Sequence, residues 1–526
     1  MALENKQEGH GTLTAPTHLK GILMHLGPGM ILAGSIVGSG ELIATTRTGA
    51  EANFSFLWLI LLGCIVKVFT QIELARYAIS SGKTTLVMLN DVPGPKIQRG
   101  NLIIWFWFLM FIATLAQQGG IVGGVGQALA ISAPLTQNGK TYNEALDNKV
   151  ALQVSKNLLA AYEAGRLQSS PEKTVALQQK IASLKTLVAS QKEHAAAKSN
   201  DAVIWATLLT LVACILLVWG NFNFIEKFCM FLVCAFTLVT IYNLIALQGK
   251  AEWAVTMEEF VGGMGFGLPE VSEADKAAGK SPLGTALATF GIIGVGASEL
   301  IAYPYWCLEK GYGKYIGPPE QTDTWLGRAR GWMKVMQFDA WGSMIIYTFC
   351  TLAFYLLGAA ILGRTGMVPE GTEMIRTLSV MYEPVFGKAA KSIFLIGAFA
   401  VLFSTFFVAI AAQSRLIVDV TSLLGFQKLP DEATRYRRIK IYNVVFALIS
   451  LLFFIFVNNP VRLVLISGVM QALMLPLLGG SVLYFRYKKT DKRLLPGKIW
   501  DALLWISFLC FSIVGLYLVL SKLGLL

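Results

Sequence analysis

Apolar runs of roughly 20 residues dominate this chain, and they constrain its fold more than any other feature. A run of that length spans the hydrocarbon core of a bilayer as a single helix. Because no water reaches the backbone there, only helices and closed barrels satisfy its hydrogen-bonding groups. The sequence therefore predicts an all-α integral membrane protein with about 11 transmembrane helices. The runs lie at 27–49, 54–79, 101–131, 203–219, 224–247, 284–307, 333–362, 389–413, 439–457, 461–485 and 499–524.

The composition supports a membrane protein and argues against a nucleic-acid-binding one. Of the 526 residues, 55% are hydrophobic and 14% are charged, whereas soluble domains carry about 25% charged residues. The net charge of +12 comes from Lys and Arg in short loops between apolar runs, where the positive-inside bias explains them. The 7 cysteines lie in or beside apolar runs and include no CxxC pair. We therefore expect buried thiols, with neither disulfides nor zinc sites.

The distribution of charged loops predicts the orientation in the membrane. Loops 83–99, 428–440 and 486–493 are rich in Lys and Arg, whereas loop 250–282 is acidic. With eleven spans, a cytoplasmic N-terminus places all three basic loops inside and the acidic loop outside. Residues 1–26 are largely polar at their start and lack a signal-peptide core. We expect a multi-pass protein of the cell's inner (plasma) membrane, in contact with lipid and with tail 1–26 in the cytoplasm.

One connection is unusually long. Residues 132–202 are polar and rich in Ala, Lys, Gln and Leu. Within them, Ser170-Pro171-Glu172 has the cap, the proline and the early carboxylate of a helix start. We expect one or two amphipathic helices on the extracytoplasmic side. An ordinary solvated helical hairpin is favoured there over a partner-binding surface.

A repeated octapeptide points to a functional site. Residues 37–44 return at 295–302 with six of the eight positions identical. Each copy places a glutamate, Glu41 or Glu299, beside small residues at membrane depth, where a buried charge is costly and usually functional. A Gly-interrupted apolar segment that recurs in both halves indicates the substrate site of a secondary transporter.

The positions of the two copies also predict the architecture. Each half holds five spans, so the second copy crosses the membrane in the opposite direction to the first. We therefore predict an inverted repeat, with residues 27–247 as its first half and 284–485 as its second. Residues 499–526 form an additional eleventh span.

The residue types of the octapeptides suit a cation. Gly and Ser permit a helix to unwind and free its carbonyl groups, which together with a carboxylate make an oxygen-lined site, whereas half-helix N-termini favour an anion. The alternative is that the glycines only allow close helix packing, but that would leave the glutamates unexplained. We predict broken first and sixth helices with a shared substrate site. Its residues are Glu41 and Glu299 as metal or proton ligands, with Gly38, Ser39, Gly40, Gly296, Ala297 and Ser298.

Short motifs elsewhere in the chain occur in a recognisable order. They are Gly27-Pro28-Gly29, Thr48-Gly49-Ala50, Ala75-Arg76 with Ser81-Gly82-Lys83, Gly220 to Glu226, and Ser467 with Leu475-Pro476. This order resembles the Nramp family of divalent-metal transporters. The resemblance covers most of the chain except 132–202, and it implies the leucine-transporter fold, with a transported divalent cation and a coupled proton or sodium ion.

The site motifs depart from that family's pattern. Its first-span DPGN stretch falls on residues 38–41, so that Gly38 stands in place of the metal-binding Asp, and the sixth-span MPH is absent. A third-span acidic path falls near Gln117 and Gln118, and a tenth-span Gln becomes Gly468. A thioether selects soft transition metals, whereas carboxylates and carbonyls suit a hard cation such as magnesium or manganese. We therefore favour a hard divalent cation.

Several alternatives remain open from the sequence. Residues 37–40 are also similar to the Gly-Ser-Gly stretch of amino-acid transporters of the same fold, so an amino acid or other small organic solute is a second candidate. A non-transporting sensor on a transporter scaffold is a third, and the sequence gives neither the coupling ion nor the oligomeric state. No P-loop or nucleophile–base set indicates an enzyme. Possible pathway residues are Gln117, Gln118, Asp339 and Gln471, and Glu73 is expected to pair with Arg76 or a nearby loop.

Overall fold

Eleven helical segments in the described part of the chain are long and apolar enough to cross a membrane. The computed structural model describes residues 7–8, 11–167, 170–220, 222–269 and 281–525. Parts of the predicted tail 1–26 and acidic loop 250–282 lie outside these residues, as does position 221 of the stretch Gly220 to Glu226. The number of spans agrees with the prediction, and most limits differ by only a few residues because polar caps extend the helices beyond the apolar runs.

The bounds of the spanning elements follow the chain in order. They are α2 (Pro28–Ile36), η1 (Val37–Thr45) and α3 (Thr46–Ala52) for the first span, α4 (Leu57–Ser81), α6 (Leu102–Ser132), α10 (Asp201–Trp219), α11 (Phe222–Leu247), α14 (Pro282–Ile292) with α15 (Ala297–Glu309) for the sixth, α17 (Asp323–Leu357) with η2 (Gly358–Gly363), α20 (Ala390–Leu423), α21 (Glu432–Val457), α22 (Pro460–Lys488) and α23 (Lys498–Lys522).

The remaining elements are short and connect the spans, apart from a helical hairpin. The helices are α1 (Leu19–His25), α5 (Thr85–Asn90), α7 (Gln137–Glu163), α8 (Pro171–Ser190), α9 (Lys192–Ala196), α12 (Met257–Gly263), α16 (Tyr312–Ile316), α18 (Met374–Ser379) and α19 (Glu383–Phe386), with 3-10 turns η3 (Gly371–Glu373), η4 (Val380–Tyr382), η5 (Gly387–Ala389) and η6 (Lys492–Leu494). Two small antiparallel pairs join β1 (Gln7–Glu8) to β2 (Thr12–Leu13) and β3 (Lys96–Ile97) to β4 (Gly100–Asn101).

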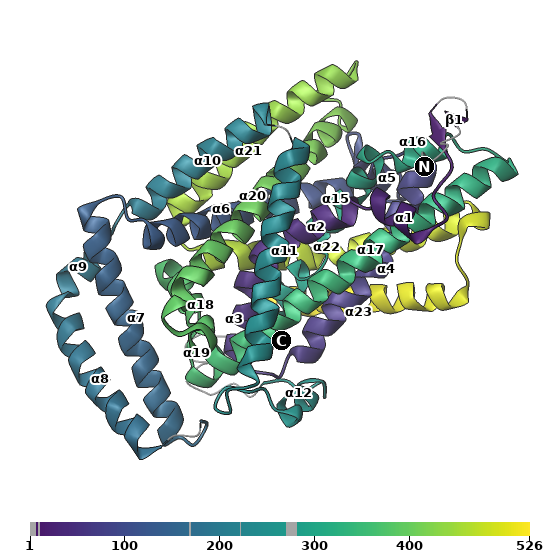
Figure 1. The fold of residues 1–526 in the computed structure, drawn as a ribbon. Coiled ribbons are helices and arrows are strands. Elements are labelled where there is room, and N and C mark those ends of the chain that lie inside the picture. Colours follow the sequence, from purple (N-terminus) through teal and green to yellow (C-terminus); the bar gives the residue numbers. More distant parts are fainter. Residues whose placement is uncertain (1–6, 9–10, 168–169, 221, 270–280, 526) are drawn as a thin grey trace.

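The hairpin of α7 and α8 stands beside the bundle, at the left of Figure 1. Helix α8 begins at Pro171, and the Ser170 side chain accepts a hydrogen bond from Lys173 N, as expected for an N-cap. Ion pairs fasten α7 to the bundle, because Asp147 contacts Arg376 at 2.8 Å and also pairs with Lys391. The side of the membrane on which this insert lies stays a prediction.

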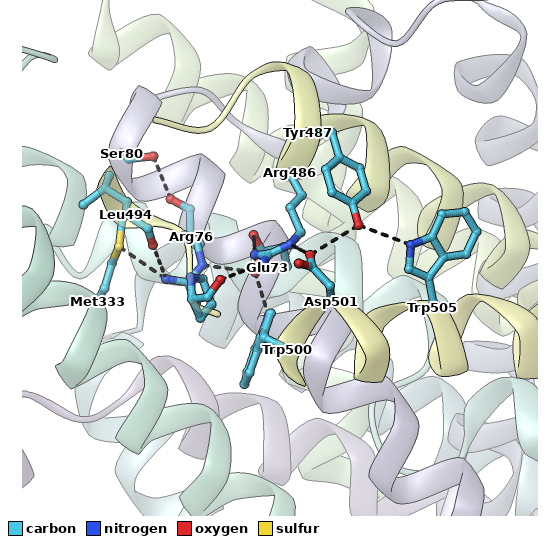
Figure 2. A network of polar contacts seen from close by, with 11 residues as sticks. Glu73, Arg76, Ser80, Met333, Arg486, Tyr487, Leu494, Trp500, Asp501 and Trp505 are labelled. Atoms are coloured by element: carbon cyan, nitrogen blue, oxygen red, sulfur yellow. Dashed lines mark hydrogen bonds and ion pairs between the residues drawn. The ribbon is translucent and has the colours of Figure 1, made fainter. Parts of the chain in front are cut away.

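A buried cluster of charges joins α4, α22 and α23 at one end of the bundle (Figure 2). Glu73 lies 3.1 Å from Arg76 Nε and 3.3 Å from Arg486 Nη1, and it also accepts a bond from the Trp500 indole. Arg486 in turn pairs with Asp501 on α23. The predicted pairing of Glu73 with Arg76 is confirmed, and the cluster fixes α4, which carries a residue of the candidate site, against the last two spans.

Candidate substrate site

The first octapeptide forms a π-helical stretch, η1, between α2 and α3. Wider π turns leave the α-helical hydrogen-bond ladder, and threonine hydroxyls take two of the carbonyls concerned. Thr45 Oγ1 donates to Gly40 O at 2.9 Å, and Thr46 Oγ1 donates to Glu41 O at 3.3 Å. The first span is therefore interrupted by a change of helical pitch, whereas the prediction was an unwound segment with free carbonyls.

The second octapeptide lies at a true break in the sixth span. Helix α14 ends at Ile292 and α15 begins at Ala297, with Gly296 as its N-cap. Between them, Gly294 has φ +54°, a left-handed conformation that glycine adopts without steric cost. Residues 293–296 therefore leave the carbonyl end of one half-helix facing the amide end of the other.

Glu41 lies against this break and is fully buried. Its Oε1 accepts hydrogen bonds from Gly294 N at 3.1 Å and from Thr351 Oγ1 on α17 at 3.0 Å. Its Oε2 has no hydrogen-bond partner among the described residues. An unpartnered buried acceptor is costly, so this oxygen is available to a ligand or a proton. The structure thus brings the first octapeptide to the break in the second.

Lys67 on α4 is a residue that sequence reasoning missed. Its side chain is 0% exposed, and Nζ donates to Phe290 O and, at 2.8 Å, to Ile293 O. The ammonium also lies 4.9 Å from the centre of the Phe290 ring. The sequence does indicate this residue. Lys67 lies in the middle of the apolar run 54–79, and a charged residue at membrane depth is usually functional, as argued for the two glutamates.

Glu299 occupies the first turn of α15 and is half-buried. The Ser298 hydroxyl lies 2.7 Å from Glu299 Oε2 and 3.0 Å from Gln471 Oε1 on α22. The Ser298 backbone N–H also donates to Gln471 Oε1, at 3.1 Å. Helix α22 thereby orients the second carboxylate through Ser298.

A chain of side-chain amides connects the two octapeptides. Gln117 on α6 donates through Nε2 to Ser39 Oγ at 2.7 Å. Its Oε1 accepts from Ser467 Oγ at 2.7 Å and from Gln471 Nε2 at 2.9 Å. Since Gln471 also contacts Ser298, the path runs without interruption from the first span to the sixth.

The other predicted pathway residues lie apart from this chain of amides. Gln118 is buried and its Oε1 has no partner among the described residues. Asp339 on α17 caps the start of α2, because its carboxylate accepts from Gly27 N at 2.9 Å, from Gly29 N at 2.5 Å and from the Tyr303 hydroxyl at 2.9 Å. Asp339 therefore has a structural partner set of its own.

The small residues of the octapeptides are tightly enclosed. A Cβ atom on Gly38 would lie 2.2 Å from Thr405 Oγ1 on α20, and one on Gly40 would lie 3.0 Å from Ile292 O. A Cβ on Gly296 would meet Glu299 Oε2 at 2.5 Å. Gly38 therefore cannot be exchanged for an acidic residue unless α20 changes as well. Ala297 is fully buried behind the break.

A pocket reaches Glu299 from the side on which α2 begins and α15 ends. It is formed by three helices: α15 contributes Ser298 and Glu299, α2 contributes Ser35, and α20 contributes mainly apolar side chains. Its lining residues are Leu32, Ser35, Ser298, Glu299, Ala302, Trp306, Val408, Ala409, Ala412, Gln413 and Leu416. Within the residues that the structure describes, no group of three or more His, Cys, Asp and Glu side chains is placed to hold a metal ion.

The larger part of the chain is similar to one known protein family. A family model described as natural resistance-associated macrophage protein-like matches residues 194–521. A curated relative, the divalent metal cation transporter MntH of Caldanaerobacter subterraneus subsp. tengcongensis, is 27% identical over 123 residues. That match covers 22% of this chain and 27% of the relative, so it spans about a quarter of the relative's length.

Solved structures match over nearly the full length. A mutant of the Eremococcus coleocola manganese transporter has a TM-score of 0.61 at 13% identity, covering 98% of this chain and 92% of that one. The same transporter with an aromatic bis-isothiourea substituted compound has a TM-score of 0.58 at 15% identity, covering 98% and 91%. The predicted fold class is confirmed, an all-α membrane protein with a leucine-transporter-type 5+5 repeat and interrupted first and sixth helices.

Proposed function

Because the chain belongs to the Nramp family, we propose that it carries a divalent metal cation across a membrane by alternating access, with a hard ion such as magnesium or manganese as substrate. The interior of the site supports this proposal through its donor atoms. Carboxylate, hydroxyl and amide oxygens surround the break, and these are the ligands of hard cations. Neither octapeptide contains Met or His, nor does the lining of the pocket.

The observation that carries the proposal is that two glutamates lie at the break of residues 293–296: Glu41 accepts a bond from Gly294 N, and Glu299 is in the first turn of α15. With Lys67 counted, two acidic side chains and one basic side chain lie around the break, which is an excess of acidic groups. This excess favours a cation. In the proposed cycle Glu299, which lines the pocket, is the ligand that meets the ion first, and the free Oε2 of Glu41 binds deeper.

The proposal also includes the membrane and the orientation of the chain in it. We place the protein in the inner (plasma) membrane with its N-terminus in the cytoplasm, on the strength of the basic loops. The pocket beside Glu299 would then open to the cytoplasm. That the chain is a transporter and not an enzyme rests on its family.

Isothermal titration of purified protein with magnesium, manganese and calcium tests the substrate class. We expect binding of at least one ion, weakened by about tenfold or more in Glu299→Gln, equivalent to about 1.4 kcal/mol. Glu258→Gln changes an exposed glutamate outside the bundle core and is the matched control. Absence of any divalent-ion binding to the unmodified protein would overturn the proposal.

One observation favours a second candidate, an amino acid or similar organic solute. The pocket is mostly apolar and includes Trp306, whose ring could contact an organic side chain. A panel of amino acids in the same titration separates the two candidates. Flux of any solute into proteoliposomes would in turn contradict a purely sensory role.

A further inference from the structure

The carbonyl end of the broken sixth helix is occupied by a side chain of the protein itself. Helix α14 ends at Ile292, and Lys67 Nζ donates to Phe290 O and to Ile293 O at 2.8 Å. The last carbonyls of a helix have no partner in their own helix and carry the negative end of its dipole. An ammonium at this point therefore satisfies two acceptors and places a positive charge where the helix favours one.

In transporters built on broken helices, such carbonyls coordinate the coupling cation. Here the ammonium of Lys67, which extends from α4, occupies the position next to these carbonyls. It is 0% exposed, and because it is covalently attached to α4 it cannot dissociate as a bound ion can.

Two carboxyl groups lie at the same break as Lys67. Glu299 is in the first turn of α15, directly after the break. Glu41 contacts the same four-residue break from its other side, through Gly294 N, and its Oε2 has no hydrogen-bond partner among the described residues. The break and the end of α14 are thus contacted by an ammonium at two carbonyl groups and by a carboxyl group at one amide.

We propose that Lys67 is a built-in cation that fills a monovalent-cation site at the carbonyl end of α14, so that the protein needs no bound Na⁺ to hold the sixth-span break. A neutral side chain in its place would leave Phe290 O and Ile293 O without this donor, next to the Glu41 carboxyl group at Gly294, as a vacant site for Na⁺. This inference does not depend on which solute the protein carries.

The test is thermal unfolding of purified Lys67→Met and of the unmodified protein, in EDTA and at constant ionic strength, with Na⁺ exchanged for N-methyl-D-glucamine. Methionine is chosen because it has a similar length and no charge. We expect the Tm of the unmodified protein to be the same in both cations. The Tm of Lys67→Met should rise with Na⁺, by about 1–2 °C for each tenfold increase above the Kd.

Two further variants define the site. Lys67→Met combined with Glu41→Gln should lose the Na⁺ response, because the counter-charge is gone. Lys83→Met, which removes an exposed lysine paired with Asp91, should respond to neither cation.

The proposal is overturned by either of two results. One is a Lys67→Met protein that is destabilised equally in both cations, as a purely structural lysine would predict. The other is a specific stabilisation of the unmodified protein by Na⁺, which can be measured even if the variant does not fold.

Discussion

At the scale of single residues, two glutamates that are equivalent in the sequence have different surroundings. Glu41 is sealed and bonded to Thr351 and to the backbone of Gly294, whereas Glu299 lines a pocket and is oriented by Ser298. The difference arises because one lies in a continuous π-helical segment and the other in the first turn after a break. The two copies of the motif therefore differ in accessibility: the Glu41 carboxyl group is buried, whereas the Glu299 carboxyl group lines a pocket.

Helix α20 packs so closely against Gly38 that no side chain fits at this position. Gly38→Ala should destabilise the protein by about 1–3 kcal/mol, because its Cβ would lie 2.2 Å from Thr405 Oγ1. Combining it with Thr405→Gly should recover part of that loss relative to the sum of the single changes. Gly327→Ala on α17, where no atom lies within 4 Å of the added Cβ, is the control. Thermal unfolding in detergent measures all four proteins, and strict additivity would contradict the close approach.

At the scale of elements, the two interrupted helices differ in the side chains that bond their backbone groups at the interruption. In the first span, the hydroxyls of Thr45 and Thr46 donate hydrogen bonds to the carbonyls of Gly40 and Glu41. In the sixth span, Lys67 takes two carbonyls and Glu41 takes the amide of Gly294. These backbone groups at the two interruptions thus have side-chain partners, as a site without bulk water favours.

The backbone amides at the start of α2 are likewise bonded by a side chain, the carboxylate of Asp339. Asp339→Asn removes the charge that faces the amide end of this helix and should lower the free energy of unfolding by about 1.5–3 kcal/mol. Asp323→Asn, which changes an exposed carboxylate in the first turn of α17, should have an effect within about 1 kcal/mol. Thermal unfolding gives both values. Equal effects of the two changes would show that Asp339 is not a helix cap.

At the scale of the whole molecule, polar networks join segments that lie hundreds of residues apart. One runs through Gln117 and Gln471 and connects the two octapeptides. The other, shown in Figure 2, joins the ends of α4, α22 and α23 around Glu73 and Arg486. Because α4 also carries Lys67, the second network fixes the helix that closes the site.

Breaking the second network should therefore have a large effect on stability. Arg486→Met leaves Glu73 short of one buried charge partner and should cost about 3–5 kcal/mol. Lys83→Met breaks an exposed pair with Asp91 and should cost about 0–1 kcal/mol. Chemical or thermal unfolding of the two variants provides the comparison. Similar losses of stability in the two variants would mean that the buried ion pair of Arg486 stabilises the protein no more than the exposed pair of Lys83 does.

The sequence by itself determined the number of spans and the interrupted first and sixth helices, whereas the shared role of Glu41 and Glu299 in one site stays a prediction. The spans and their interruptions follow from local hydrophobicity and from an internal repeat, both of which are properties of the chain read in order. The start of α8 at Pro171 followed for the same reason, since a helix cap is formed by neighbours in sequence.

Only the tertiary structure decided what surrounds those motifs. That Lys67 points at the carbonyls of α14, that Thr405 excludes a side chain at Gly38 and that Asp339 caps α2 all depend on contacts between distant segments. Such contacts are set by how helices pack against one another, which no local pattern encodes. The physical reason is that hydrophobicity specifies which residues leave water, whereas the partner that each buried polar group finds is a property of the assembled bundle.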